Sequence, residues 1–507
     1  MFPSLDDSST LFFPLCIFFA LAVPLVWCCR VLLRLRTPSC GCDTCKSYVS
    51  GSWSAEFPNL SDWYVHLLCN SPTRTVHVHV LRNVITADPA NVEHIIAWNF
   101  GNYPKGKAFS DILGDLLGRG IFNVDGVHWK LQRKLASSEL GSICVREHAF
   151  GIVSAEITDR LVPLLLSSRG EVMDLQEVFR RFSFDTVCKF SFGLDPGCLD
   201  LSMPLSSFAQ AFDLASRLSA ERALAVSPVL WKIMRLFNVG SERKLRQATR
   251  LINVLAEQVI KQRRLEMNKN INKNSSDLLS RFIRNIKDDG YLRDIVISFL
   301  LAGRDTVASG LTGFFWLLSK NPRVEKCIRE ESDAVMGTME TGEPSFNQIR
   351  DMQYLHAAVH ESLRLLPPVQ FDSKFSLRND VLPDGTFISG QTRVTYHPYA
   401  MGRMEQIWGP DATEFRPERW LRDSVNGPVF SPESPFKYPV FQGGPRVCLG
   451  KEVAVMEMKS VALALIRRFD VRLVDRNQPL RFSPGLTANV SGGLPVIAME
   501  KGNGKCL

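Results

Sequence analysis

The apolar residues of this chain first gather near the N-terminus, in an uncharged run of nineteen residues from Leu11 to Cys29. A helix needs about 20 apolar residues to span a bilayer. Asp6 and Asp7 precede the run and three arginines follow it between positions 30 and 36. This asymmetry predicts an uncleaved anchor over residues 1–30 whose C-terminal side is cytosolic. A cleavable signal peptide is the alternative, but it needs positive charge ahead of the apolar run.

Beyond a linker expected over residues 31–60, most segments repeat their apolar positions with helical spacing. Strand-like alternation is confined to short stretches. The segment "TVHVHV" at 75–80 alternates and is expected to pair with "VITA" at 84–87 as a hairpin, with His77 and His79 facing solvent. No further linker is evident, so residues 61–507 are predicted to form one mainly helical domain with a small β portion.

The most apolar predicted helix of this domain runs from Tyr291 to Lys320, and a second membrane span is one interpretation of it. Arg304 and Asp305 lie in its middle, and each costs about 2.5–3.5 kcal/mol at the centre of a bilayer. A helix buried in the protein core is therefore favoured. Ala302 and Gly303 precede the charged pair and leave a patch with almost no side chain, which a bulky group or a small gas molecule can approach.

Charge and cysteine content narrow the class of function. The net charge is +8 with 22% charged residues, and no dense basic run with interleaved aromatics is present. This pattern argues against nucleic acid binding and fits an acidic partner or an anionic membrane surface. Thirteen cysteines without regular spacing indicate a reduced cytosolic domain. Cys42, Cys45, His66 and Cys69 copy the spacing of a zinc ribbon, but the last two are expected near the core face of an amphipathic helix, which disfavours zinc.

Several catalytic patterns are near misses. The segment "HESLR" at 360–364 resembles a zinc protease helix, but Arg364 stands where the second histidine ligand is required. The segment "GNYPKGKA" at 101–108 has the spacing of a phosphate-binding loop, but Ala108 lacks the hydroxyl group that holds magnesium. No G-x-S-x-G nucleophile elbow is found. Hydrolase and nucleotide-hydrolysing functions are therefore disfavoured.

The segment "FQGGPRVCLG" at 441–450 holds one cysteine, Cys448, with no cysteine or histidine within forty residues on either side. Zinc needs several soft ligands, whereas the iron of a haem needs one axial ligand from the protein. A predicted helix start follows the cysteine and is expected to favour its thiolate form. Gly444 and Gly450 are expected to let the backbone approach a flat ring, and Arg446 to neutralise a propionate. The loop thus indicates a haem-thiolate site.

This loop completes the pattern F-x-x-G-x-R-x-C-x-G and resembles the haem-binding loop of the cytochromes P-450. The resemblance implies the fold of that family, with a long central helix over the haem, and Cys448 as the axial ligand of the iron. The segment "AGRDT" at 302–306 resembles its oxygen-activation motif, which implies Asp305 and Thr306 as a proton-relay pair. The other matching positions imply haem contacts for Trp129, Arg133, Ala302, Gly303, Lys374, Phe441, Gly444, Arg446 and Gly450, and a structural triad of Glu361, Arg364 and Arg419. Lys374 stands where many members carry a propionate-binding residue; an exposed strand lysine is the alternative.

Longer segments resemble the plant 94 family of cytochromes P-450, among them "NYPKGKAFSDILGDLLGRGIFNVDG" and "YHPYAMGRMEQIWGPDATEFRPERWL". The segments "CGCDTC" and "GLTANVSGGLPV" are most similar to its C subfamily. The resemblance implies oxidation of the terminal carbon of jasmonoyl-isoleucine, through the 12-hydroxy to the 12-carboxy form, with free fatty acids as the alternative substrates. It also implies heme b as cofactor, electrons from NADPH through a cytochrome P-450 reductase, and a single-pass location in the endoplasmic reticulum membrane.

The resemblance places three residues over the haem as substrate contacts: Val369, Gln370 and Phe371. A basic face on the sulfur side of the haem is expected to receive the acidic reductase and comprises Lys130, Arg133, Lys134, Arg446 and Lys451. Two other functions stay open at this point. One is a hydroperoxide rearrangement enzyme of the same fold, which needs neither oxygen nor reductase, and the other is a membrane-tethered haem sensor or scaffold without turnover.

Overall fold

The structure is a computed structural model that describes Val26 and residues 40–200, 207–269, 277–337, 343–425, 427–477 and 479–501. The anchor predicted over residues 1–30 lies, Val26 apart, outside the described residues. The helices up to the central one are α2 (Asp43–Ser50), α3 (Leu60–Cys69), α4 (Pro89–Glu93), α5 (Gly106–Leu117), α6 (Gly126–Leu140), α7 (Ile143–Glu156), α8 (Val162–Ser167), α9 (Leu175–Phe192), α10 (Ser207–Leu224), α11 (Pro228–Phe237), α12 (Gly240–Asn268) and α13 (Leu278–Asn285).

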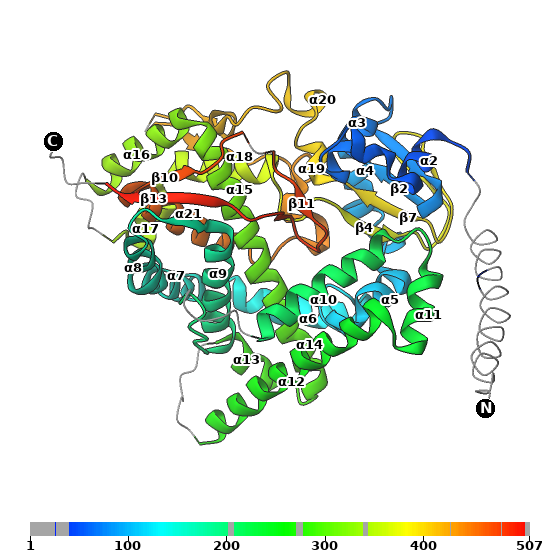
Figure 1. Cartoon of the computed structure of the whole chain (residues 1–507), viewed down its shortest axis with the longest axis horizontal. Helices are drawn as coiled ribbons and strands as arrows, with labels where there is room; N and C mark the ends of the chain where they lie inside the picture. The colour runs from blue at the N-terminus through cyan, green and yellow to red at the C-terminus, as the bar shows by residue number, and fades with distance from the viewer. Residues whose placement is uncertain are drawn as a thin grey trace, which may run out of the picture.

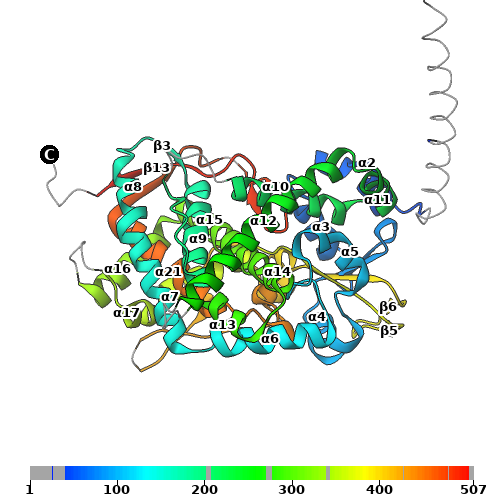
Figure 2. The ribbon, with the colours of Figure 1, turned by 90° about the horizontal axis from the view of Figure 1, so that it is seen from below.

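The remaining helices are α14 (Asp289–Leu300), α15 (Thr306–Lys320), α16 (Pro322–Met336), α17 (Phe346–Asp351), α18 (Gln353–Leu365), α19 (Pro398–Met401), α20 (Glu405–Trp408) and α21 (Lys451–Arg468). Helices thus dominate, as the periodicity predicts. Helices α2 to α4 lie at one side of the molecule, beside the sheet described next, and α7 to α9 with α16 and α17 lie at the other (Figures 1 and 2).

Four short strands form the sheet on the N-terminal side, in the order β1 (Thr75–Val78), β2 (Asn83–Thr86), β7 (Arg393–Tyr396) and β4 (Asp372–Phe375). Strands β1 and β2 pair antiparallel with Thr75 opposite Thr86, which confirms the predicted hairpin. The first strand ends earlier than predicted, because His79–Leu81 form a 3-10 turn. His77 and His79 are exposed, as expected.

A second sheet has the order β10 (Phe469–Leu473), β13 (Pro495–Glu500) and β3 (Val172–Asp174). Three two-stranded ribbons complete the β portion: β5 (Asp380–Val381) with β6 (Phe387–Ile388), β8 (Leu421–Arg422) with β9 (Val429–Phe430), and β11 (Phe482–Ser483) with β12 (Asn489–Val490). The sequence therefore correctly predicts a mainly helical fold with a small β portion.

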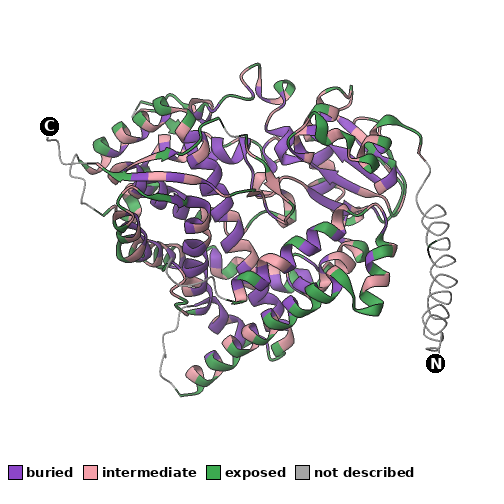
Figure 3. Cartoon of the chain, viewed as in Figure 1, coloured by how far each residue is buried: buried purple, intermediate pink, exposed green. Residues whose placement is uncertain are grey.

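The apolar segment predicted as a core helix runs through the middle of the molecule as α14, a π-helical turn at Leu301–Asp305, and α15 (Figure 1). It is long and apolar enough to cross a membrane, but most of it is buried within the protein (Figure 3). Arg304 is buried in it and donates to Asp213 at 2.6 Å and to Asp305 at 3.2 Å. These ion pairs explain how the core accommodates the charges, and the core-helix prediction is confirmed.

The segment predicted as a linker contains folded structure. Helix α2 and a 3-10 turn at Ser52–Ala55 lie within residues 31–60. Cys45 of α2 is only 1% exposed, and the Tyr48 hydroxyl donates to the carbonyl oxygen of Leu224 at 2.8 Å. The folded domain therefore begins before residue 61. His66 of α3, expected near the core face, is exposed instead, since Trp63, Tyr64 and Leu68 occupy the buried face of that helix.

Candidate haem site

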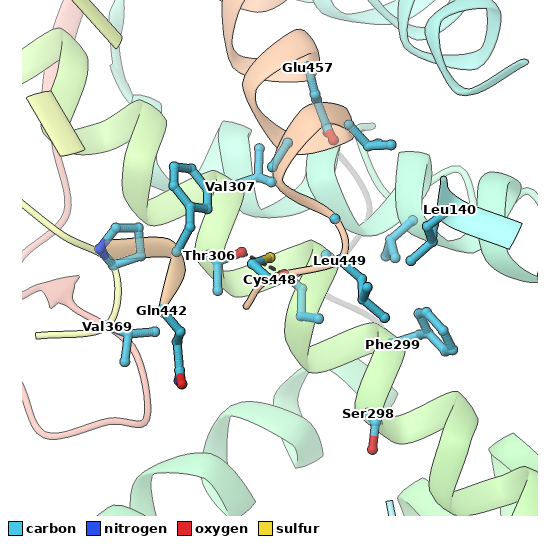
Figure 4. A pocket seen from close by; sticks show the side chains of 18 of the residues that line it. Leu140, Ser298, Phe299, Thr306, Val307, Val369, Gln442, Cys448, Leu449 and Glu457 are labelled. Carbon is cyan, nitrogen blue, oxygen red and sulfur yellow. Dashed lines mark hydrogen bonds between the residues drawn. The ribbon is translucent and has the colours of Figure 1, made fainter. Parts of the chain in front are cut away.

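A cavity of about 310 Å³ lies where the central helix crosses the loop that leads into α21. One wall is formed by residues of the π turn and α15, and the facing wall by residues 439–450 and the first turns of α21. Thr306 and Cys448 both line this space (Figure 4). The cavity thus brings together the two sequence motifs that predict oxygen activation and haem ligation, although 142 residues separate them.

Cys448 lies at the end of a loop held by its own backbone. The Cys448 amide donates to the carbonyl oxygen of Phe441 at 2.8 Å, and α21 begins at Lys451. The thiol group is open to the cavity. Burial in the protein raises the pKa of Cys448, and this effect outweighs the opposing Gly450 and Lys451 amides and the charge of Arg133. The protein groups alone therefore do not stabilise the thiolate form of Cys448, contrary to the expectation from the helix start. A bound metal cation would stabilise it.

Two of the three glycines of the loop, Gly444 and Gly450, serve different purposes. Gly444 has a φ of +59°, and a Cβ atom there would lie 2.2 Å from the carbonyl oxygen of Ile96. Its small size is thus required by the backbone of the neighbouring turn, and the expectation that it also makes room for a ring stays a prediction. A Cβ atom on Gly450 would meet nothing within 4 Å. The open space predicted for a flat group therefore lies at Gly450, on the cavity wall.

Two arginines of the cavity wall are placed to meet anionic groups. Arg446 donates to Asp125 at 2.7 Å. Its guanidinium carbon lies 4.6 Å from the centre of the Trp129 ring. Trp129, for which a haem contact is predicted, does not line the cavity. The Arg446 Nε atom is buried and has no hydrogen-bond partner among the described residues. Arg133 also lines the cavity and donates to the carbonyl oxygen of Val447. Both arginines keep donors available for a carboxylate such as a haem propionate.

These features fit an iron porphyrin. A single thiol faces the cavity, open space adjoins Gly450, and an unpartnered guanidinium nitrogen of Arg446 lies on the rim. Haem requires one protein ligand and cations for its two propionates. Cys448 would hold the iron, and Arg133 and Arg446 would hold the propionates.

On the wall formed by the π turn, Ala302 and Gly303 both line the cavity and leave little side-chain bulk at that point, as predicted. A Cβ atom on Gly303 would lie 2.4 Å from the side chain of Val187, so this glycine also permits close packing against α9. The Thr306 hydroxyl faces the cavity and donates to the carbonyl oxygen of Ala302 at 2.5 Å. The π turn ends at Asp305, directly before this threonine, and such turns are frequent at functional sites.

Asp305 does not line the cavity. Its carboxylate accepts from Arg304 at 3.2 Å, and burial raises its pKa while that arginine lowers it. The structure therefore places Thr306 of the predicted proton-relay pair on the cavity wall and Asp305 behind it. The relay role of the pair stays a prediction.

Lys374 is buried in β4 and does not reach the cavity, so it is neither the exposed strand lysine nor a residue of the cavity wall. It donates to Asp372 at 2.7 Å, and burial lowers its pKa to about 7. Asp372 lines the cavity and also accepts from Tyr396 at 3.1 Å and from Gln442 at 3.1 Å. Burial alone would raise the pKa of Asp372, but Lys374 and Lys105 together hold it far below its usual range. A propionate contact for Lys374 stays a prediction that requires rearrangement of this cluster.

Only one of the three predicted substrate contacts lies at the cavity. Val369 lines it. The Gln370 side chain instead accepts from the Ser61 hydroxyl at 2.6 Å, and the Phe371 ring lies 5.9 Å from the ring of His397. Neither residue lines the cavity, because the backbone after Val369 turns both side chains towards α3 and α19.

The cavity also contains polar residues that sequence reasoning missed, notably Glu457, Ser298 and Gln442 (Figure 4), together with Thr186. Glu457 accepts from the Thr186 hydroxyl at 2.8 Å, and burial raises its pKa to about 8. It is therefore a neutral acid at pH 7. A lone acid on the apolar face of the helix after Cys448 is the signal in the sequence that could have revealed it.

The predicted triad forms one buried network under the site. Arg364 donates to Glu361 at 2.7 Å and 2.8 Å, and Arg419 donates to Glu361 at 2.9 Å. The Trp420 indole donates to the same carboxylate at 2.9 Å. Arg364 also donates to the carbonyl oxygen of Ala412 at 2.6 Å. The network joins α18 to the segment that leads towards the cysteine loop.

The basic residues predicted to face a reductase do not all reach the surface. Lys130 and Lys134 of α6 are exposed, and Lys451 and Arg133 are half-buried. Arg446 points into the molecule towards Asp125, so it is not part of a surface patch. The surface part of this predicted face is thus formed chiefly by α6.

Comparisons with known proteins show the family of the chain. The sequence profile of the family Cytochrome P450 matches residues 70–493. Cytochrome P450 94C1 of Arabidopsis thaliana is 60% identical over 482 residues, which cover 93% of this chain and 96% of the relative. Cytochrome P450 94B1 of the same plant is 46% identical and covers 86% of each chain, and cytochrome P450 94A1 of Vicia sativa is 41% identical and covers 90% of each. The chain therefore belongs to the cytochrome P450 family, with relatives throughout its 94 group.

Proposed function

We propose that this cytochrome P450 oxidises the terminal carbon of jasmonoyl-isoleucine, first to the 12-hydroxy and then to the 12-carboxy form, in the catabolism of jasmonate hormones. The observation that carries the proposal is the 60% identity with cytochrome P450 94C1 over 93% of the chain, joined to the resemblance of the cysteine-rich and C-terminal segments to the C subfamily. Omega-hydroxylation of free fatty acids is the second candidate, because the resemblance to the 94 family implies it as the alternative activity.

The lining of the cavity supports an aliphatic reacting group. Apolar side chains form most of it, including Phe122, Phe190, Phe299 and Val369. Such a lining stabilises an aliphatic end and excludes water from the reacting carbon. The Ser298 hydroxyl (Figure 4) lines the cavity and donates to the carbonyl oxygen of Asp294 at 2.8 Å, so its oxygen can accept a hydrogen bond from an amide group of the substrate.

The chain is a monooxygenase that carries haem and receives electrons from NADPH through a reductase. When bound, the thiolate-ligated haem supplies the activation of molecular oxygen. In this proposal the Thr306 hydroxyl, which lines the cavity and donates to the carbonyl oxygen of Ala302, hands a proton across the cavity. We assign resupply of this proton to Asp305, one residue earlier and buried. This proton transfer requires the Thr306 hydroxyl to break its hydrogen bond to the carbonyl oxygen of Ala302.

Electron delivery and location complete the proposal. The exposed lysines Lys130 and Lys134 lie on α6, the helix whose Arg133 adjoins the cysteine loop. A basic surface there would attract an acidic reductase to the thiolate side of the haem. We place the protein in the endoplasmic reticulum membrane, held by one anchor over residues 1–30 with the catalytic domain in the cytosol, as the charges around Leu11–Cys29 predict.

The test uses the detergent-solubilised full chain with reductase and NADPH, supplied separately with jasmonoyl-isoleucine and with dodecanoic acid, and mass spectrometry of the products. The proposal predicts 12-hydroxy- and then 12-carboxy-jasmonoyl-isoleucine, at a higher kcat/KM than for the fatty acid. Preference for dodecanoic acid would support the second candidate. Turnover of a fatty acid hydroperoxide without NADPH would indicate a rearrangement enzyme, and haem binding without turnover of any of these compounds would indicate a sensor.

A further inference from the structure

Three cysteine thiols come together at the start of the described domain, away from the haem cavity. The sulfur atoms of Cys40, Cys42 and Cys45 all lie within 4.8 Å of one another. Cys42 is the N-cap residue of α2, and Cys45 lies in its first turn. Among the described residues, this is the group of at least three potential metal ligands whose ligand atoms come so close together. The group includes neither His66 nor Cys69. The structure thus forms a different cluster from the one that the zinc-ribbon spacing indicates.

The three thiols differ in how firmly they are held. Cys45 is 1% exposed and packs in the core cluster with Tyr64 and Leu68, whereas Cys40 is half-buried and Cys42 is exposed. One sulfur is therefore fixed in the core, and two can adjust and remain reachable from solvent.

We propose that Cys40, Cys42 and Cys45 bind a zinc(II) ion, with water in the fourth position. Zinc–sulfur bonds of about 2.3 Å place the sulfurs of a tetrahedral site about 3.8 Å apart. Because the sulfurs already lie within 4.8 Å, closure needs shifts of about 1 Å, which the side chains of Cys40 and Cys42 can provide by rotation. Three converging thiols in a cytosolic domain favour a metal over a disulfide, which would use only two of them.

The site would fasten the segment that precedes α2 to the domain. Cys40 comes before that helix, and Cys45 is part of the core cluster beneath it. An ion shared between them closes a short loop against the domain and stabilises its folded form, because the loop is not preformed in the unfolded chain. The site lies outside the haem cavity, so the inference does not rest on the proposed substrate.

The test measures zinc on the haem-loaded full chain, kept reduced in detergent. The protein is incubated with zinc chloride and passed through a gel-filtration column in the presence of a weak chelator. Its zinc and haem iron are then measured by elemental mass spectrometry. We expect one zinc ion per haem for the wild type and for Cys144→Ser, a matched control at an exposed cysteine elsewhere. The Cys42→Ser variant and the Cys40→Ser/Cys42→Ser/Cys45→Ser variant should lose it. The carbon monoxide difference spectrum checks that each variant is folded.

Alkylation gives a second readout that does not depend on stoichiometry. Zinc should slow the reaction of Cys42 with N-ethylmaleimide at least tenfold and leave that of Cys144 unchanged. Absence of retained zinc in the folded wild type overturns the proposal, as does equal zinc content in the triple variant. A disulfide between Cys42 and Cys45 in the reduced preparation also overturns it, since it would identify a redox pair.

Discussion

The Thr306 hydroxyl donates to the carbonyl oxygen of Ala302 at 2.5 Å, while its side chain, like that of Cys448, lines the cavity. Removing the hydroxyl in Thr306→Ala leaves the cavity wall without the group that is proposed to hand over protons. We expect the yield of product per NADPH consumed to fall several-fold, with the remaining electrons lost to reduced oxygen species. The measurement is the ratio of product to NADPH oxidised.

The same helix offers a matched control. Thr312 makes the same kind of bond, to the carbonyl oxygen of Ala308 at 2.7 Å, but does not line the cavity. Thr312→Ala should form as much product per NADPH as the wild type. Thr306→Ser, which keeps the hydroxyl, should also do so, unlike Thr306→Ala. Full coupling in Thr306→Ala would remove Thr306 from the relay.

The exposed lysines of α6 test the route of the electrons. Reversing both charges in Lys130→Glu/Lys134→Glu should slow reduction by the reductase about tenfold at low salt and much less at high salt, because salt screens exposed charges. Stopped-flow absorbance of the haem measures the rate. Lys326→Glu, at an exposed lysine of α16, is the control. A rate that does not change at low salt would place the docking surface elsewhere.

The ion-pair network of Glu361 is predicted to be structural. Because Glu361 and Arg364 are fully buried, Glu361→Gln leaves buried guanidinium charge uncompensated, at a cost of about 3–5 kcal/mol. The thermal midpoint of unfolding should fall accordingly. Glu433 pairs with Lys437 at 2.9 Å on the surface, and Glu433→Gln should cost at most about 1 kcal/mol. Equal stability of the two variants would contradict a structural role for the network.

Stability should depend on pH through Glu457. Burial raises the pKa of Glu457 to about 8 from an ordinary 4.5, so the folded protein holds this proton more tightly than the unfolded chain. The contribution to stability is then greatest below pH 4.5 and is lost as the pH rises through 8. The wild-type melting temperature should fall relative to that of Glu457→Gln between about pH 6 and pH 8.5. Parallel melting curves for the two proteins would contradict a neutral Glu457.

The sequence predicts what depends on local pattern. The hairpin of Thr75–Val78 and the buried helix around Arg304 follow from alternation and charge placement, the contacts of Glu361 are implied by the family resemblance, and the structure has all of them. What the sequence does not reveal depends on side-chain direction in the folded chain. Gln370 turns to Ser61, and Lys374 turns to Asp372.

Residues distant in the sequence set the remaining differences. Gly444 is required by the backbone of Ile96, and Glu457 reaches the cavity because Thr186 of α9 accommodates it. The cluster of Cys40 with Cys42 and Cys45 arises because α2 folds onto the domain, where a linker was expected. Neither periodicity nor motif spacing carries this information.

The central claim is that Cys448 ligates a haem iron, and the carbon monoxide difference spectrum of the reduced protein tests it most directly. The wild type and Cys144→Ser should show the red-shifted Soret band of a thiolate-ligated haem, and Cys448→Ala should lose both this band and activity. Retention of the red-shifted band in Cys448→Ala, or its absence from the folded, haem-loaded wild type, would contradict the assignment.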